Sequence, residues 1–140
     1  YRRSVYQERE EFILRASFSL KPGDPAEIKA KMDDFAQRRR EKQPLEYPSA
    51  GSTFKRPAPV DGQPVYAAAL IDGCGLKSLT VGGAQVSEKH AGFVINRGGA
   101  SCDDIIKVMA QVRERVFRET GVTLEPEVRY LGKEGEQWNF

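Results

Sequence analysis

The stretch from Ser101 to Gly121 constrains the fold most, because it has the pattern of one long amphipathic helix. Ser101 or one of its neighbours can cap the first turn, and helices often end at a glycine such as Gly121. A helix with one apolar face buries that face against a second layer, so the pattern predicts a packed domain. The apolar residues that recur at helical spacing are Ile105, Ile106, Met109, Val112 and Val116.

An earlier part of the chain predicts a second long helix, which begins after Asp24 and runs to about Glu41. Asp24 can act as the cap, Pro25 suits the first helical position, and Glu27 lies three residues after the cap. The residues expected on the inner face of this helix are Ile28, Met32 and Phe35.

Four segments have the patterns of strands. Residues 11–20 alternate between apolar and polar side chains, which predicts a half-buried strand. Leu79 with Val81, and then residues 92–95, indicate short buried strands. Residues 122–130 alternate again, with one proline as an interruption, and predict a last strand.

The remaining segments complete the predicted order of elements. Residues 64–74 predict a short helix that Gly75 closes, and residues 43–65, with five prolines, predict a long irregular connection. The order is strand, helix, loop, helix, strands, helix, strand. We therefore expect an α+β domain, in which a small, mostly antiparallel sheet is packed by two long helices and one short helix.

Composition limits the classes of function. A chain of 140 residues with 39% apolar residues has the size of one domain, and it contains no run of 18 apolar residues. Its 22 Lys and Arg against 20 Asp and Glu give a net charge of +2, too near neutral to indicate a nucleic-acid partner. Cys74 and Cys102 lack metal-type spacing and suggest small buried side chains in a reduced, cytoplasmic protein.

Ser52 follows a glycine and precedes Lys55 and Arg56, so we expect an irregular segment with cations close by. In such a place a serine is most often an ordinary turn residue. The GxSxG pattern of a hydrolase is missing, and the chain has one histidine, His90, so no zinc site is expected. Ser52 could still serve as a proton donor, because that role depends on position more than on a triad.

Two further groups have both an ordinary and a functional interpretation. The basic run 38–42 at the end of the first long helix suits a solvated helix end, but with Lys55 and Arg56 it could bind an anion. Glu125 and Glu127 fit an exposed strand edge, whereas a buried Glu127 would be an acid or base candidate. The glycines at 73, 75, 82 and 83 fit helix closure and tight turns better than a phosphate loop.

Four segments together resemble the carboxy-terminal domain of the UDP-N-acetylenolpyruvoylglucosamine reductase (MurB) family. They are YRRSVY at the start, RRREKQPLEYPSAGSTFKRP, AALIDGCGLKSLTVGGAQVSEKHAGFVIN and GVTLEPEVRYLG. The resemblance covers nearly the whole chain in order, so it implies that residues 1–140 form one substrate-binding domain.

The resemblance also implies a reaction and roles for residues. The family reduces UDP-N-acetylglucosamine enolpyruvate to UDP-N-acetylmuramate in peptidoglycan precursor synthesis, with NADPH and a bound FAD. Ser52 matches the serine that delivers a proton, and Arg2 and Glu127 match residues that steady an enolate-like intermediate. Arg56 stands where some members have Asn. The residues that match substrate contacts are Tyr1, Arg39, Lys42, Lys55, Arg56 and His90.

The family's flavin-binding region precedes the YRRS motif, and the present sequence opens on Tyr1 rather than Met. We therefore expect a fragment that alone holds no FAD and does not turn over NADPH. The spacing between YRRS and the first helix resembles the shorter subgroup, which lacks an additional tyrosine loop. The alternative, from another class, is a non-catalytic module that binds a nucleotide or another anion through the basic run.

Overall fold

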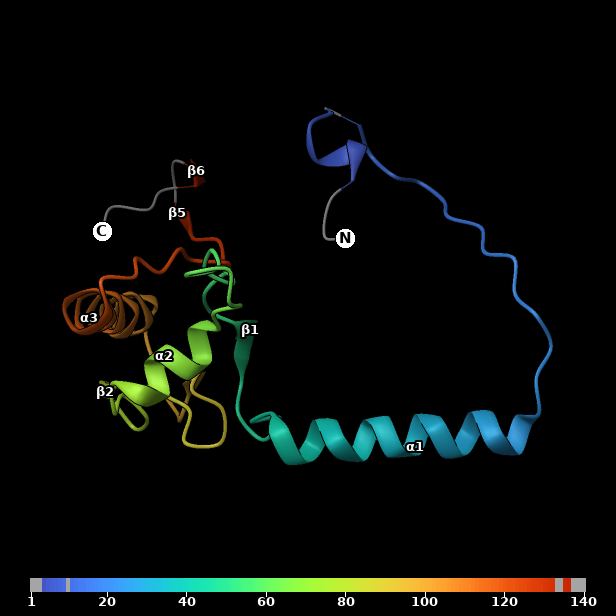
Figure 1. The fold of residues 1–140 in the computed structure, drawn as a ribbon, viewed down its shortest axis with the longest axis horizontal. Helices are drawn as coiled ribbons and strands as arrows, with labels where there is room; N and C mark the ends of the chain where they lie inside the picture. Colours follow the sequence, from blue (N-terminus) through green and yellow to red (C-terminus); the bar gives the residue numbers. More distant parts are fainter. Residues whose placement is uncertain (1–3, 10, 133–134, 137–140) are drawn as a thin grey trace. The chain divides into compact units, whose positions relative to one another are not determined.

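The structure, a computed structural model, describes residues 4–9, 11–132 and 135–136 and divides the chain into two units, residues 1–34 and 35–140 (Figure 1). The first unit holds a single 3-10 turn, η1 (Val5–Gln7), and the first part of helix α1 (Pro25–Lys42). The second unit holds the end of α1, the sheets and the other helices.

Helix α3 (Cys102–Thr120) forms where the sequence predicts it and with the predicted ends. The Ser101 hydroxyl accepts a 3.1 Å hydrogen bond from the Asp104 N–H, and the Asp104 carboxylate accepts one of 2.9 Å from the Ser101 N–H. Gly121 ends the helix at a φ of 72°, a left-handed conformation that costs glycine little. Its buried side chains are Val108, Met109, Val112 and Val116, whereas Ile105 and Ile106 are half-buried.

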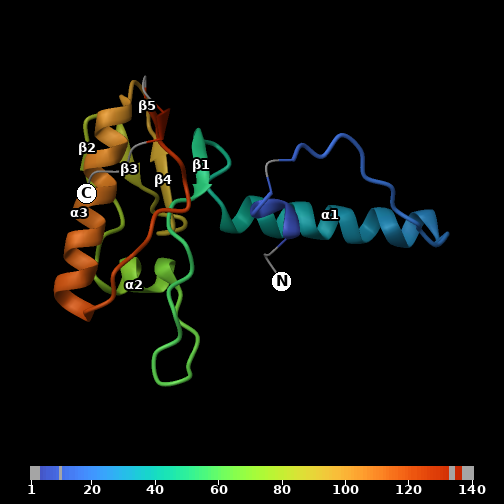
Figure 2. The ribbon, with the colours of Figure 1, turned by 90° about the horizontal axis from the view of Figure 1, so that it is seen from above.

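Helix α3 lies along one face of a four-stranded antiparallel sheet of order β1-β4-β3-β2 (Figure 2). The strands are β1 (Ser49–Ser52), β2 (Thr80–Val81), β3 (Ala84–Val86) and β4 (Phe93–Asn96). The predicted strands near residues 79–81 and 92–95 are thus confirmed, although Leu79 and Val81 are half-buried rather than buried. Strands β1 and β3 are additional, and β1 occupies part of the connection expected to be irregular.

Helix α2 (Ala67–Gly73) packs against α3 and completes the core. It begins three residues later than the predicted segment 64–74 and ends before Gly75, as expected. The three helices and the antiparallel sheet confirm the α+β class. The core residues include Phe54, Ile71, Leu76, Val86, Val94 and Leu124 together with the buried side chains of α3.

The predicted strand at residues 11–20 is wrong. These residues have no regular structure, and Phe12, Leu14, Phe18 and Leu20 are 94%, 95%, 82% and 84% exposed. A strand needs a partner for its N–H and C=O groups, and none of the described segments pairs with residues 11–20. Alternation of side chains alone therefore did not produce a strand here.

Helix α1 has the predicted beginning and end but not the predicted inner face. The Asp24 carboxylate accepts a 2.9 Å hydrogen bond from the Glu27 N–H, which is the predicted cap. Ile28, Met32 and Phe35, however, are 47%, 61% and 63% exposed, and no residue of α1 is buried. The local capping signals determine this helix, whereas its apolar residues meet no second layer among the described residues.

The segment 122–130 is not the predicted strand. It pairs with the rest of the domain through one isolated bridge, between Phe54 and Pro126. Proline has no N–H to donate, so a regular ladder cannot continue through it. After this segment, β5 (Leu131–Gly132) and β6 (Gly135–Glu136) pair with each other as a small second sheet.

Candidate functional site

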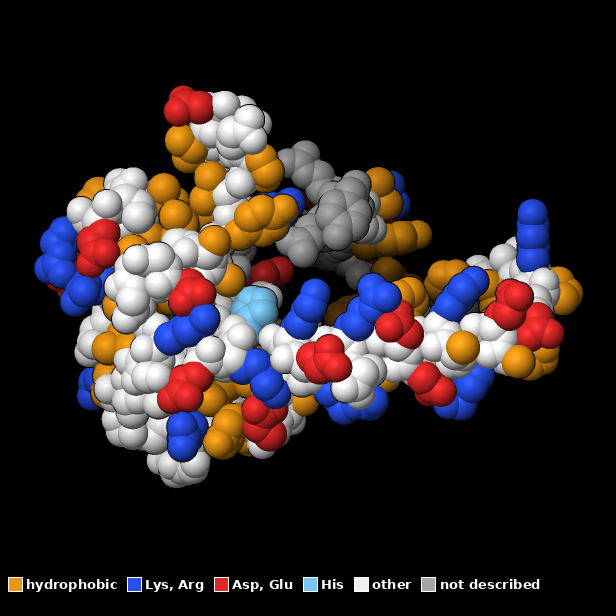
Figure 3. All heavy atoms as spheres, turned by 60° about the horizontal axis from the view of Figure 1, so that its bottom comes forward, with side chains coloured by type: hydrophobic (Ala, Val, Ile, Leu, Met, Phe, Trp, Pro, Cys, Tyr) orange, Lys and Arg blue, Asp and Glu red, His pale blue; other side chains and the backbone are white. Residues whose placement is uncertain are grey.

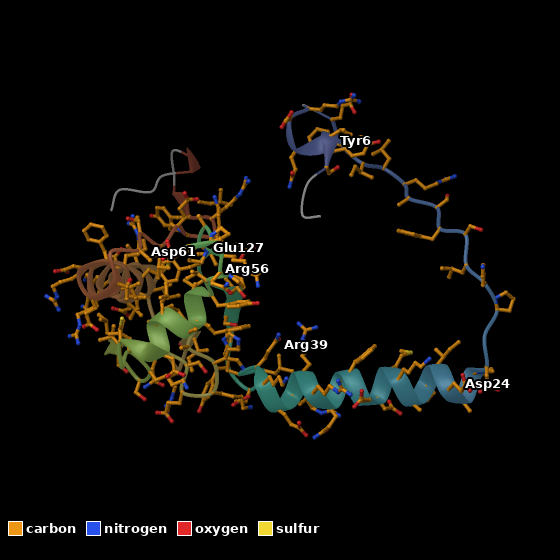
Figure 4. The ribbon with its side chains drawn as sticks, viewed as in Figure 1. Tyr6, Asp24, Arg39, Arg56, Asp61 and Glu127 are labelled. Atoms are coloured by element: carbon orange, nitrogen blue, oxygen red, sulfur yellow. The ribbon has the colours of Figure 1, made fainter. Side chains whose placement is uncertain are left out.

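Arg39 and Ser52, two of the predicted site residues, line the same hollow of about 500 Å³ in the second unit. We call it the Arg39–Ser52 hollow. Its wall on one side is the end of α1 and the following turn, and on the other side β1 with Phe93 of β4. Figure 4 shows the Arg39 side chain standing out from α1. The volume lies in the range of sites for small molecules.

A bulge in β1 sets the position of Ser52. Ser49 pairs with Ile95 and Ser52 pairs with Phe93, so β1 contains one residue more than β4 between the same two pairs. Gly51 takes up the distortion at a φ of +86°, a conformation that other residues rarely adopt. The glycine before the serine is therefore required by the backbone, and the exposed Ser52 ends the strand at the hollow.

Glu127 belongs to a backbone segment that runs beside the segment after Ser52. The Glu127 N–H donates a 2.9 Å hydrogen bond to the Thr53 carbonyl, and the Lys55 N–H donates one of 2.8 Å to the Glu125 carbonyl. These two bonds hold residues 125–127 antiparallel to residues 53–55. The Glu127 side chain is exposed, so the burial that would favour an acid or base role is not present in this chain.

The two cations after Ser52 have other partners. The Lys55 ammonium forms a 3.1 Å ion pair with Glu125, and both side chains are more than half exposed. The Arg56 guanidinium lies 4.1 Å from the centre of the Tyr66 ring, a cation–π contact. Lys55 and Arg56 thus flank the serine segment but do not line the hollow.

His90 contacts the hollow through Phe93. Its ring meets the Phe93 ring edge to face, with centroids 4.9 Å apart, and Phe93 lines the hollow. Its Nδ1 accepts a 3.1 Å hydrogen bond from the Gly92 N–H, so the Nε2 of the neutral ring carries the proton. Figure 3 shows the imidazole (pale blue) reaching the surface among basic and acidic side chains. His90 can therefore donate a hydrogen bond outward.

The end of α1 brings one cation, Arg39, to the wall of the hollow. The Arg39 Nε donates a 3.1 Å hydrogen bond to the Gln43 side chain, which fixes the guanidinium at the wall. Lys42, the last residue of α1, is exposed and does not line the hollow.

A further cation near this turn, Lys89, forms a 3.1 Å ion pair with Glu46. The pKa of Glu46 is lowered first by its backbone hydrogen bond and then by the one to Lys89.

Tyr47 and Phe93 also line the hollow, and the sequence did not indicate a role for them. The Arg97 guanidinium lies 5.2 Å from the centre of the Tyr47 ring, and its Nη1 donates a 3.0 Å hydrogen bond to the Gln85 side chain. Tyr47 lies between prolines just before the serine segment, and this position is a local pattern by which it could have been found. No local pattern indicates Phe93, since it belongs to a strand whose sequence is typical of a buried core.

Tyr1 and Arg2, predicted to contact the substrate and the intermediate, lie outside the described residues. Within residues 4–9, 11–132 and 135–136, no three His, Cys, Asp or Glu side chains gather in a way that could hold a metal ion. In the same residues, no helix has both the length and the apolar character needed to cross a membrane.

The two cysteines differ. Cys74 is buried as predicted, and burial raises the pKa of its thiol, which also contacts the Glu119 carboxylate. Cys102 is exposed, so its predicted burial is wrong, because the first residue of α3 faces away from the core.

The turn at Gly82 and Gly83 joins β2 to β3, in keeping with the tight turn expected there.

Comparison with known proteins gives the family. Residues 43–131 match the family model described as UDP-N-acetylenolpyruvoylglucosamine reductase, C-terminal domain. The chain is 49% identical over 133 residues to the UDP-N-acetylenolpyruvoylglucosamine reductase of Caldanaerobacter subterraneus subsp. tengcongensis, over 95% of this chain and 42% of that protein. It is 48% identical over 134 residues to the protein of the same name from Clostridium beijerinckii, over 96% and 42%.

A solved structure agrees. The crystal structure of UDP-N-acetylenolpyruvylglucosamine reductase (MurB) from Thermus caldophilus matches with a TM-score of 0.58 and 35% identity, over 79% of this chain and 37% of that one. The chain therefore spans less than half the length of the relatives it matches. The family model covers more than half of the chain, and the chain belongs to the UDP-N-acetylenolpyruvoylglucosamine reductase family.

Proposed function

We propose that this chain is the substrate-binding part of an oxidoreductase that reduces UDP-N-acetylglucosamine enolpyruvate to UDP-N-acetylmuramate in peptidoglycan biosynthesis. The observation that carries the proposal is the Arg39–Ser52 hollow, in a chain of this family. It combines a cation with an exposed hydroxyl on a bulged strand, and Glu127 lies on the neighbouring backbone. A cation suits the diphosphate and the carboxylate of such a substrate.

The reaction adds one hydride and one proton to the enolpyruvyl double bond. The hydride joins the terminal CH₂ carbon, which becomes a methyl group, and the electron pair moves to the neighbouring carbon and its carboxylate. The Ser52 Oγ–H gives its proton to that neighbouring carbon and regains one from water, to which Ser52 is exposed. Arg2 steadies the negative charge that develops before the proton arrives, and Glu127 does so when its carboxyl group is protonated and donates a hydrogen bond.

The described residues do not fit FAD. The Arg39–Ser52 hollow suits one small molecule, and the Gly82–Gly83 turn joins two strands rather than a strand to a helix. The N-terminus of α3 lies beside this turn, but the Asp104 carboxylate, which accepts a 2.9 Å hydrogen bond from the Ser101 N–H, already occupies the place where a cofactor diphosphate commonly binds. We assign FAD and NADPH to an amino-terminal flavin-binding domain outside this chain, where the bound flavin supplies the hydride.

The remaining assignments follow from the same proposal. Arg39 and Lys42 contact the nucleotide portion of the substrate, His90 makes a polar contact with the substrate, and Tyr1, Lys55 and Arg56 complete the contacts. A cytoplasmic location and the absence of nucleic-acid and membrane partners stay predictions.

Activity tests this proposal. We expect the longer protein to oxidise NADPH only when UDP-N-acetylglucosamine enolpyruvate is present, and the 140-residue chain to hold no flavin and oxidise no NADPH. A flavin spectrum that survives purification of the chain contradicts the second expectation. Oligonucleotide binding that falls steeply with salt, without saturable binding of the sugar nucleotide, favours the non-catalytic anion-binding module instead.

A further inference from the structure

Lys89 lies in the loop between β3 and β4, directly before His90, and its ammonium group contacts three oxygens. The Nζ donates to the Arg40 carbonyl at 3.2 Å, to the Gln43 carbonyl at 3.4 Å and to the Glu46 carboxylate at 3.1 Å. An ammonium group has three N–H donors, so each donor has one acceptor. The side chain is 35% exposed, which leaves the group partly shielded from water.

The three acceptors belong to the end of α1 and to the turn that follows it. The last carbonyls of a helix have no partner within the helix, and a positive charge near them is favourable. No residue of α1 is buried, and in the turn that follows it Pro44 is buried. The burial of Pro44 and the contacts of Lys89 therefore both hold this part of the chain, and the Lys89 contacts are the ones that reach the helix end from the β3–β4 loop.

The backbone of Lys89 is itself held in place. The hydroxyl of Ser87, which is 1% exposed, accepts hydrogen bonds from the Lys89 N–H at 3.2 Å and from the His90 N–H at 3.3 Å. The loop on which Lys89 stands is thus anchored to the core. Because this loop is fixed to the core, its lysine can hold in place a more exposed segment to which it binds.

That exposed segment is a wall of the site. Arg39, Gln43 and Leu45 line the Arg39–Ser52 hollow on the side of α1. Lys89 binds the carbonyl of Gln43, and that of Arg40, which follows Arg39 in the chain. On the opposite side, the neighbour of Lys89, His90, packs on Phe93 of the hollow. One side chain therefore joins two of the stretches that carry predicted substrate contacts, the end of α1 and the loop before β4.

We propose that Lys89 is a positioning residue, which fixes the turn at residues 43–46, and with it one wall of the Arg39–Ser52 hollow, against the loop that carries His90. The identity of the ligand rests on the proposed function. Lys89 does not line the hollow, so it acts through Arg39, Gln43 and His90 rather than by contact with the ligand.

The test compares three variants of the 140-residue chain. Lys89→Met keeps the length of the side chain but removes its donors, and Lys89→Arg keeps a cation. Lys77→Met is the matched control, because Lys77 is 37% exposed and forms one 2.8 Å ion pair, with Asp72, away from the hollow. The ligand is UDP-N-acetylglucosamine enolpyruvate, and the melting temperature is followed for each variant.

Two readouts decide the proposal. Hydrogen exchange is measured at the amides of Gln43, Leu45 and Tyr47, which donate to carbonyls of the helix end and the turn. We expect Lys89→Met to speed exchange at these amides and to weaken ligand binding, each by about tenfold. Lys77→Met should change neither, Lys89→Arg should restore part of both, and the melting temperatures of Lys89→Met and Lys77→Met should agree.

The proposal is overturned if Lys89→Met exchanges and binds like the wild-type chain, or if its exchange rises equally at core amides such as that of Val112, which indicates a general loss of stability. Failure of the proposed function looks different. If the wild-type chain binds no sugar nucleotide, the ligand assignment fails, whereas exchange at Gln43, Leu45 and Tyr47 still decides whether Lys89 fixes the turn.

Discussion

The Glu127 N–H donates a 2.9 Å hydrogen bond to the carbonyl of Thr53, the residue that follows Ser52. This bond brings a segment from the end of the domain beside the serine segment, although the two are far apart in the sequence. Ser52, the proposed proton donor, and Glu127, whose protonated carboxyl group is proposed to stabilise the developing charge, thus stand on adjacent backbone segments. The function proposed from the four resembling segments requires that residues far apart in the sequence, such as Ser52 and Glu127, come close together in the fold.

The first prediction concerns Ser52→Ala in the longer protein. We expect NADPH to reduce the flavin at the wild-type rate, and the subsequent reduction of the enolpyruvyl substrate to slow by about 10²- to 10⁴-fold, because a general acid is lost. Rapid-mixing absorbance measurements separate the two half-reactions. Thr123→Ala, which removes an exposed hydroxyl that does not line the hollow, is the control. If both half-reactions of Ser52→Ala stay fast, Ser52 is not the proton donor.

Gly51→Ala tests the bulge. An added β-carbon meets nothing within 4 Å, so any cost comes from the φ of +86°. We expect the free energy of unfolding to fall by about 1–2 kcal/mol, as measured by urea denaturation. Gly73→Ala, also with open space but without a positive φ, is the control and should cost little. Equal stability of the two variants would show that the backbone at residue 51 is not strained.

The two methionines test the corrected view of the helices. Met109→Ala, at a site with 0% exposure in α3, should lower the free energy of unfolding by about 2–5 kcal/mol through the cavity it leaves. Met32→Ala, at a 61% exposed site in α1, should change it by about 0.5 kcal/mol or less. Chemical denaturation of the 140-residue chain measures both. A large loss of unfolding free energy for Met32→Ala would contradict its exposure and support the buried inner face that the sequence predicted.

The cysteines should differ in reactivity. Cys102 is exposed, whereas burial raises the pKa of Cys74 and reduces its thiolate fraction. In the native chain, an aromatic disulfide reagent at pH 8 should label one thiol fast and one slowly. Cys102→Ser should remove the fast phase and Cys74→Ser the slow one. A fast phase that persists in Cys102→Ser would contradict the burial of Cys74.

Asp104 should make stability depend on pH. Hydrogen bonds from Ser101 hold the pKa of Asp104 below its ordinary value of 3.8. The folded form therefore prefers the ionised carboxylate, so this contribution is complete above pH 3.8 and is lost as pH falls through the lower folded pKa. Melting temperatures of the wild-type chain and Asp104→Asn should converge below that range. A difference that is the same at every pH would refute this role for the capping box.

Features determined by neighbouring residues were predictable from the sequence. Asp24 and Pro25 begin α1, and Ser101 and Gly121 bound α3, because capping groups act within one turn of the helix end. Strand β1, of sequence SAGS, has no apolar alternation, and its hydrogen bonds come from β4. Residues 11–20 show the converse, since a strand pattern gives no strand where no described segment pairs with it.

The candidate site was predictable in part. The glycine and the cations around Ser52 indicated an unusual segment, the residues alone also indicated the basic run 38–42 and Glu127 as candidates, and the resemblance gave Arg39 and Glu127 their roles. The sequence could not show that Arg39 lines the hollow with Ser52 while Lys55 and Arg56 bind Glu125 and Tyr66. Such pairings depend on which backbones the fold places side by side.

The most direct test of the account is a titration of the isotopically labelled 140-residue chain with UDP-N-acetylglucosamine enolpyruvate, followed through backbone amide shifts. The account predicts saturable shifts that cluster at Arg39, Ser52, His90 and Glu127. The same titration of the longer protein shows whether the amino-terminal part is needed to complete the site. Absence of shifts at these residues in both proteins, at millimolar ligand, would contradict the claim that the Arg39–Ser52 hollow binds the substrate.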